Sequence, residues 1–303
     1  MRCLRNLGSR AVSAAQLKYL QAWLMPKVVI AAVTALATPA VAFGSVSHPL
    51  EHSVCGWIKE PAAFWIWRRF AGSPVDMSGE GRITYSTFET QDHRKLIGFR
   101  YGSSSGVGPK HAQGALLFAQ GNAMLASHII ERLRPFANSG LDVFVFDFRG
   151  YGLSQGVPRL IALISDYHDI ARRLLADGYR HLYLYGVSLG AVILVNAAVG
   201  IHYSALALDS LPSRVSTRPF TCPKTLDPVT VLPENTSDIL VVAGGSDNLV
   251  PPEESHLLRV TVAHRGGTEM VLPGIGHPDL KGRSWNDRTA IVLRFFNAMR
   301  TRQ

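Results

Sequence analysis

The stretch Tyr183-Leu184-Tyr185-Gly186-Val187-Ser188-Leu189-Gly190 decides how the rest of the chain is interpreted. Its apolar start predicts a buried strand, and an apolar, helix-like stretch over residues 191–199 follows the G-x-S-x-G pattern at once. This order is typical of a nucleophile elbow, a turn so tight that the serine at its tip adopts strained backbone angles. A larger side chain at Gly186 or Gly190 would collide with the neighbouring strand or helix. We therefore expect Ser188 to stand clear of the sheet, at a helix N-terminus whose dipole favours a developing anion.

Short buried strands and amphipathic helices alternate along residues 81–303. The first two predicted strands flank the polar turn Gln91-Asp92-His93-Arg94 and form an antiparallel hairpin. Pro251-Pro252-Glu253-Glu254 and the capping-box pair Ser284 and Asp287 indicate the starts of the last two helices. The alternation predicts an α/β fold, with a mostly parallel, doubly wound sheet covered on both faces. The predicted strands are residues 83–90, 96–101, 115–119, 143–146, 182–185, 205–208, 239–243 and 270–272.

A serine nucleophile needs two partners, and the sequence offers candidates for both. A base must take the hydroxyl proton, and a carboxylate must orient that base. In a doubly wound sheet, such groups lie on loops at the carboxyl ends of strands, where Asp247 and His277 are expected. The chain order Ser188, Asp247, His277 is also the order that hydrolases with this sheet use. Asp238 precedes its strand and so lies at the wrong end, whereas Asp209, which ends the strand after the elbow, remains a lesser alternative acid.

The developing oxyanion needs two backbone N–H donors. Leu189, which follows the nucleophile, is expected to supply one. The loop after the strand over residues 115–119 is expected to supply the other, from the N–H of Asn122, because Gly121 permits close approach. An ordinary strand–helix turn is the alternative interpretation of that loop.

Three segments carry a resemblance to a known family. Leu117-Phe118-Ala119-Gln120-Gly121-Asn122-Ala123 resembles the H-G-N-A loop of the Bem46-like α/β-hydrolases, which are related to the serine aminopeptidase-like group. Asp147-Phe148-Arg149-Gly150-Tyr151-Gly152-Leu153-Ser154 resembles the family's D-Y-R-G-Y-G-x-S segment. Residues 244–251, G-G-S-D-N-L-V-P, resemble its G-x-x-D-x-x-V-P acid loop. The similarity spans residues 82–300 and implies an α/β-hydrolase fold with a short lid insertion at residues 210–237.

The resemblance also implies roles for single residues. Ser188, Asp247 and His277 match the positions of the family's triad. Gln120 departs from the pattern, because the family usually has His there, which leaves the geometry of the loop open. Asp147 and Arg149 are expected to brace loops and to take no part in bond breaking.

These features together predict a serine hydrolase that cleaves a carboxylic ester or thioester of a small-molecule or lipid-like acyl substrate through an acyl-enzyme. A peptidase or amidase of the same fold is one alternative, and a non-catalytic binding protein is another. No cofactor is expected, and no metal, because the chain has no C-x-x-C or His-rich spacing. The oligomeric state is not predicted.

The first 43 residues differ from the rest in charge and in hydropathy. Residues 1–50 contain no Asp or Glu, and a basic start precedes the apolar residues 28–43, which include Ala40-Val41-Ala42. This pattern predicts a secretory signal peptide cleaved near Phe43. An uncleaved anchor through residues 28–43 is the alternative, although a helix of that length spans only about 24 Å of a roughly 30 Å hydrocarbon core. The protein is therefore expected to be exported, periplasmic or secreted, or membrane-anchored.

The net charge argues against nucleic acid as a partner. Residues 1–42 contain five basic residues and no acidic one, so the net charge falls from +9 to +4 without them. No basic motif with interleaved aromatic residues remains in the mature chain.

Residues 44–80 form a segment of their own, rich in aromatic side chains. We expect an N-terminal arm packed on the main domain, residues 81–303. The alternative is an amphipathic segment, residues 57–70, that lies on a membrane surface. Cys55 and Cys222 remain in the mature chain, and two buried, unpaired thiols are favoured over a disulfide because the sequence cannot show that they meet.

Overall fold

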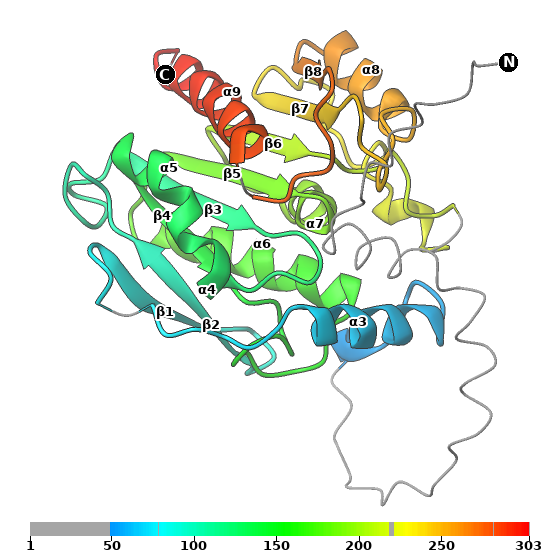
Figure 1. Cartoon of the computed structure of the whole chain (residues 1–303), viewed down its shortest axis with the longest axis horizontal. Coiled ribbons are helices and arrows are strands. Elements are labelled where there is room, and N and C mark those ends of the chain that lie inside the picture. The colour runs from blue at the N-terminus through cyan, green and yellow to red at the C-terminus, as the bar shows by residue number, and fades with distance from the viewer. Residues whose placement is uncertain (1–48, 78, 218–220, 281, 303) are drawn as a thin grey trace, which may run out of the picture. The chain divides into compact units, whose positions relative to one another are not determined.

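The computed structural model describes residues 49–77, 79–217, 221–280 and 282–302 (Figure 1). The predicted signal peptide or anchor, residues 1–43, lies outside these residues. Among the helices that are described, none is long and apolar enough to cross a membrane. Val46–Gln303 clusters as one compact unit, and the elements below all belong to it.

An eight-stranded sheet forms the centre of the molecule, in the order β1-β2-β4-β3-β5-β6-β7-β8. β1 and β2 form the predicted antiparallel hairpin, β2 pairs antiparallel with β4, and all other neighbours are parallel. Every residue of β3 to β7 is buried, which fits their mostly apolar sequences. The strands are β1 (Ile83–Glu89), β2 (Lys95–Tyr101), β3 (Gly114–Ala119), β4 (Leu141–Phe146), β5 (Leu182–Val187), β6 (Ala205–Asp209), β7 (Ile239–Gly244) and β8 (Thr268–Leu272).

The strand order reverses at β3, which is where a ligand site is expected in such a sheet. β4 pairs with one side of β3, and β5 pairs with the other. In open α/β sheets, ligands bind outside the carboxyl ends of the strands at such a switch point. The loop that begins with Gln120 follows β3, and Ser188 follows β5, so both lie at this point.

Helices cover both faces of the sheet (Figure 1). One core cluster packs α4 (Ala126–Ile129), η3 (Ile130–Leu133), α5 (Arg134–Asn138) and α9 (Gly282–Arg300) against the strands. Aromatic rings join these layers, including Tyr185 stacked on Trp285 with centroids 6.0 Å apart. Behind the sheet in the same view, α6 (Leu160–Ala176) packs on α7 (Leu189–Ala197), which contacts β3, β5 and β6.

Two predicted helix starts were wrong. α8 (His256–His264) begins after Pro251-Pro252-Glu253-Glu254, because these residues form a turn in which the Glu254 N–H donates to the Pro251 carbonyl. α9 begins at Gly282, so Ser284 lies inside its first turn and does not cap it.

The arm before β1 contains η2 (Pro49–Glu51) and α3 (Lys59–Phe70). α3 buries Phe64, Trp67 and the carboxylate of Glu60 against the rest of the unit. One Glu60 oxygen accepts hydrogen bonds from the Ser53 hydroxyl and the N–H groups of Val54 and Cys55. The other accepts from the N–H of Leu160 at 2.6 Å, which ties the arm to the start of α6.

Cys55 and Cys222 form a disulfide across a sequence separation of 167 residues, so the expectation of two unpaired thiols was wrong. The two cysteines meet because the tertiary structure brings their segments together. The Glu60 carboxylate holds the backbone around Cys55, and the Cys222 N–H donates to the Val215 carbonyl in the excursion after β6. The bridge therefore joins the arm to this excursion. Its described part contains one short helical turn, η4 (Lys224–Leu226).

Candidate active site

Ser188 has the strained backbone of a nucleophile elbow, with φ +56° and ψ −119°. The glycines around it are required for the reason predicted. A Cβ on Gly186 would lie 2.5 Å from the Ala191 Cα, and a Cβ on Gly190 would lie 2.0 Å from the Ala119 carbonyl oxygen. The Ser188 N–H donates to the Asp209 carbonyl at 2.8 Å, so β6 holds the strained turn in place.

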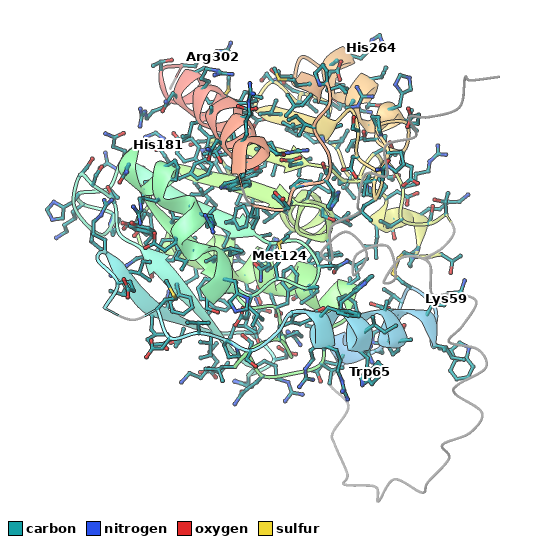
Figure 2. All side chains as sticks on the ribbon, viewed as in Figure 1. Lys59, Trp65, Met124, His181, His264 and Arg302 are labelled. Carbon is teal, nitrogen blue, oxygen red and sulfur yellow. A yellow bond between two sulfur atoms is a disulfide. The ribbon has the colours of Figure 1, made fainter. Side chains whose placement is uncertain are left out.

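The loop after β3 lies directly against this elbow. A Cβ on Gly121 would be 3.5 Å from the Ser188 Cβ and equally close to the Met124 side chain, which Figure 2 shows near the middle of the molecule. Within the described part of the chain, neither the Leu189 N–H nor the Asn122 N–H donates to a protein acceptor. Both residues are half-buried, so two unengaged donors lie on segments that contact Ser188.

Gln120 supports this loop, although it departs from the family pattern. Its side chain is buried, and its amide nitrogen donates to the Phe146 carbonyl at 2.8 Å. Its amide oxygen accepts from the Tyr167 hydroxyl at 3.2 Å. The side chain is therefore turned toward β4 and α6, and it anchors the first residue of the loop.

Asp247 and His277 meet at the same edge of the sheet. The His277 Nδ1 lies 2.8 Å from one Asp247 oxygen, and the N–H groups of Leu249 and Val250 both donate to the other at 2.9 Å. Burial raises the pKa of the Asp247 carboxyl, but the His277 contact and the two N–H groups outweigh it, so this pKa lies below its ordinary value. An ionised carboxylate favours the His277 tautomer with its proton on Nδ1, and in that tautomer Nε2 is the ring nitrogen that can accept a proton.

The loops that carry these two residues are bonded to each other. The Gly245 N–H donates to the Leu272 carbonyl at 2.8 Å, and the Ser246 N–H donates to the Ile275 carbonyl at 2.9 Å. A Cβ on Gly244 would lie 2.5 Å from the Ile275 carbonyl oxygen, so glycine is needed for this close approach.

Asp209, the lesser alternative acid for the predicted catalytic histidine, is paired with Arg288 and not with His277. Its carboxylate forms a fully buried ion pair with Arg288 of α9 and also accepts from the Tyr185 hydroxyl at 3.1 Å. The second guanidinium nitrogen of Arg288 donates to the Gly276 carbonyl at 2.6 Å, next to His277. Arg288 was not among the residues that the sequence predicted for the site. Its position four residues before Val292, on the apolar stripe of the last helix, was the available signal.

Asp147 contacts the segment that follows the Gln120 loop. One of its oxygens accepts from the Ala126 N–H at 2.6 Å at the start of α4. Burial raises the pKa of this carboxyl to about 6, and the Ala126 hydrogen bond offsets only part of that effect. Asp238 precedes β7, at the opposite end of the strand from Asp247.

The sheet order, the strained serine between β5 and α7, and the Asp–His pair after β7 and β8 define the α/β-hydrolase class. A family model described as serine aminopeptidase, S33, matches residues 110–209. The chain belongs to this serine hydrolase group of the α/β-hydrolases, as its motifs implied.

Known proteins of several organisms are similar to this chain. An uncharacterized protein of Mycobacterium tuberculosis is 33% identical over 214 residues, covering 63% of this chain and 71% of that protein. An uncharacterized membrane protein of Saccharomyces cerevisiae is 31% identical over 130 residues, covering 41% of this chain and 44% of that one. The Pyrococcus furiosus esterase Pf2001 superposes with a TM-score of 0.60 at 17% identity, covering 74% of this chain and 94% of that one, a likeness of fold.

Proposed function

We propose that the protein cleaves a carboxylic ester or thioester through an acyl-enzyme, with Ser188 as nucleophile, His277 as base and Asp247 as its orienting acid. The observation that carries the proposal is the buried Asp247 carboxylate on His277 Nδ1, at the sheet edge where Ser188 stands in its strained turn. The backbone N–H groups of Leu189 and Asn122 are the proposed oxyanion donors.

The reaction follows from these positions. His277 Nε2 takes the Ser188 proton as the hydroxyl oxygen attacks the acyl carbon, and the two N–H donors stabilise the oxyanion. When the tetrahedral intermediate collapses, His277 gives its proton to the leaving alcohol or thiol. Water, activated by His277, then attacks the acyl-enzyme, and the carboxylic acid leaves with Ser188 restored.

A peptidase or amidase of the same fold is the second candidate, because the matching family model is described as a serine aminopeptidase. The buried carboxylates Asp209 and Asp247 are paired with Arg288 and His277, so neither of these two is available to bind a substrate ammonium group. A non-catalytic binding protein would have no need for the complete Ser188, Asp247 and His277 set.

Fluorophosphonate labelling separates these candidates. The wild-type protein should be labelled at Ser188 and should turn over p-nitrophenyl esters faster than aminoacyl p-nitroanilides. Ser188→Ala should abolish both labelling and turnover with little change in thermal midpoint, because a hydroxyl is removed from a turn surface. Labelling at another serine would contradict the nucleophile, and no labelling of a folded protein would favour the binding protein.

The acid has its own test. Asp247→Asn should leave His277 in the wrong tautomer and lower kcat by up to about 10⁴-fold. Asp238→Asn is the matched control, since that carboxylate lies at the other end of β7, and it should leave kcat unchanged. Equal loss in both variants would contradict the role of Asp247.

We also propose that the mature protein begins near Phe43 and works outside the cytoplasm. The Cys55–Cys222 disulfide supports an oxidising compartment. N-terminal sequencing of the protein from its native host tests the cleavage. An intact N-terminus that resists carbonate extraction would instead assign residues 28–43 to an anchor.

A further inference from the structure

The outer side of the N-terminal arm carries exposed aromatic side chains that the fold does not use. Trp57 is 82% exposed and Trp65 is 61% exposed, and Ile58 and Phe70 are also exposed. Figure 2 shows Trp65 on the edge of α3 that is turned away from the sheet. We propose that these four residues, with Arg68 and Arg69, form a surface that docks on an anionic lipid bilayer. We name it the α3 face, and its role is independent of the proposed hydrolysis.

The helix has two distinct apolar sides. Phe64 and Trp67 are buried and pack edge to face with ring centroids 5.4 Å apart. The burial of these two rings anchors the inner side of α3. The outward side chains are left partly or mostly open to solvent. Large exposed aromatic groups gathered in one short segment mark an interaction surface.

The charge of the α3 face selects the partner. Glu60 is the only acidic residue in residues 57–75, and its carboxylate is buried and hydrogen bonded inward. Arg68 and Arg69 are exposed, and among the described residues no carboxylate forms an ion pair with either. The Arg69 guanidinium lies over the Trp65 ring, 4.8 Å from its centroid. Tryptophan beside unpaired cations is the composition that binds the headgroup region of anionic bilayers.

The same charges argue against a second copy of the chain as the partner. In a two-fold dimer, each α3 face would meet its own copy. Arg68 and Arg69 would then approach like charges, with no exposed carboxylate in residues 57–75 to neutralise them. Anionic lipid headgroups supply the missing negative charge.

The α3 face is also preformed. The Cys55–Cys222 disulfide and the Glu60 hydrogen bonds hold both the start of the arm and the helix. The described part of the arm, residues 49–77, is already ordered before binding, which favours affinity. The disulfide links this surface to the excursion after β6, the strand whose last residue supports the Ser188 turn. Docking would therefore bring the bilayer to the side of the molecule from which the excursion extends.

Vesicle flotation of the full chain tests the proposal, with phosphatidylcholine vesicles that contain or lack phosphatidylglycerol. The wild-type protein should float with the anionic vesicles. Arg68→Gln/Arg69→Gln should lower the partition coefficient roughly 30-fold. Trp57→Ser/Trp65→Ser should lower it by more than roughly tenfold. All variants should keep the thermal midpoint of the wild type, which shows that they are folded.

Matched controls change the same residue types elsewhere. Arg172→Gln/Arg173→Gln removes an exposed arginine pair from α6, and Leu257→Ser/Val260→Ser removes exposed apolar groups from α8. Both controls should float like the wild type. Equal flotation of the wild type and the α3-face variants would overturn the proposal, because the membrane contact would then lie elsewhere in the chain. Absence of flotation would overturn it too, as would sedimentation velocity showing self-association that the α3-face variants lose.

Discussion

Arg288 and Arg149 are both completely buried arginines paired with carboxylates, yet they serve different parts of the molecule. Arg288 lies beneath the site, where it binds Asp209 and the Gly276 carbonyl beside His277. Arg149 lies beneath the arm, where its guanidinium binds three carboxylates. These belong to Asp166 of α6, Asp92 of the β1–β2 turn and Glu51 of η2.

The two arginines use the same interaction, a buried ion pair, in different ways. A buried ion pair contributes little net stability, because the cost of desolvation offsets the attraction between the charges. Removing one partner is strongly destabilising, because the other charge stays buried without compensation. Both arginines fix segments that are distant in the sequence. Arg288 connects the backbone partner of Ser188 to the loop of His277, whereas Arg149 connects the arm to the hairpin. Loss of either should destabilise the fold, but only loss of Arg288 should change the chemistry.

Arg288→Met should have the largest effect. It leaves Asp209 buried without its partner, so the free energy of unfolding should fall by about 3–5 kcal/mol in urea denaturation. The folded fraction should lose about 10- to 100-fold in kcat with KM nearly unchanged, because the His277 loop loses a bracing donor. Arg288→Met/Asp209→Asn is the control. It should recover stability while kcat stays low, and a recovered kcat would show that Arg288 is structural only.

Arg149→Met should cost similar stability without the catalytic loss. Asp166 would remain buried without its cation, which predicts a fall of about 3–5 kcal/mol in the free energy of unfolding. At urea concentrations below the unfolding transition of this variant, kcat per folded molecule should equal that of the wild type. Arg149→Met/Asp166→Asn should recover part of the stability. A large drop in kcat would contradict the separation between the two arginines.

Cys55→Ser/Cys222→Ser should have a smaller effect, on the arm alone. Removing the bridge should lower the free energy of unfolding by about 2–4 kcal/mol and leave kcat unchanged. Adding reductant should destabilise the wild type but not the double variant, which is the internal control. Equal stability of oxidised and reduced wild type would show that the bridge contributes nothing.

The smallest expected effect is a pH dependence of the Arg149 cluster. Burial raises the pKa of the Asp92 carboxyl, but hydrogen bonds from Arg149 and Thr90 outweigh it and lower this pKa from 3.8 to about 2. A lowered carboxyl pKa contributes stability above the unfolded value, and that stability is lost as the pH falls toward about 2. The thermal midpoint of the wild type should therefore drop more steeply over this window than that of Asp92→Asn. Parallel curves would contradict the ion pair.

Local patterns in the sequence predicted the fold and the candidate residues of the site. The glycines around Ser188 are determined by steric contacts within a few residues and with the adjacent strand, and the predicted collisions are present. Asp247 and His277 follow parallel strands, whose carboxyl ends must share one edge of the sheet, so their meeting could be inferred from order alone. The triad and oxyanion roles of these residues stay predictions until the variants are measured.

Tertiary structure alone decided which other distant side chains meet. The Asp209–Arg288 pair and the Cys55–Cys222 bridge join residues far apart in the chain, and neither has a local pattern that names its partner. The first depends on how α9 is placed on the sheet and the second on how the arm packs on the rest of the unit, and apolar periodicity specifies neither. An apolar stripe on a helix predicts which side of that helix is buried, but it does not predict which apolar surface covers it. The pairing of distant side chains is therefore determined only when the whole unit packs.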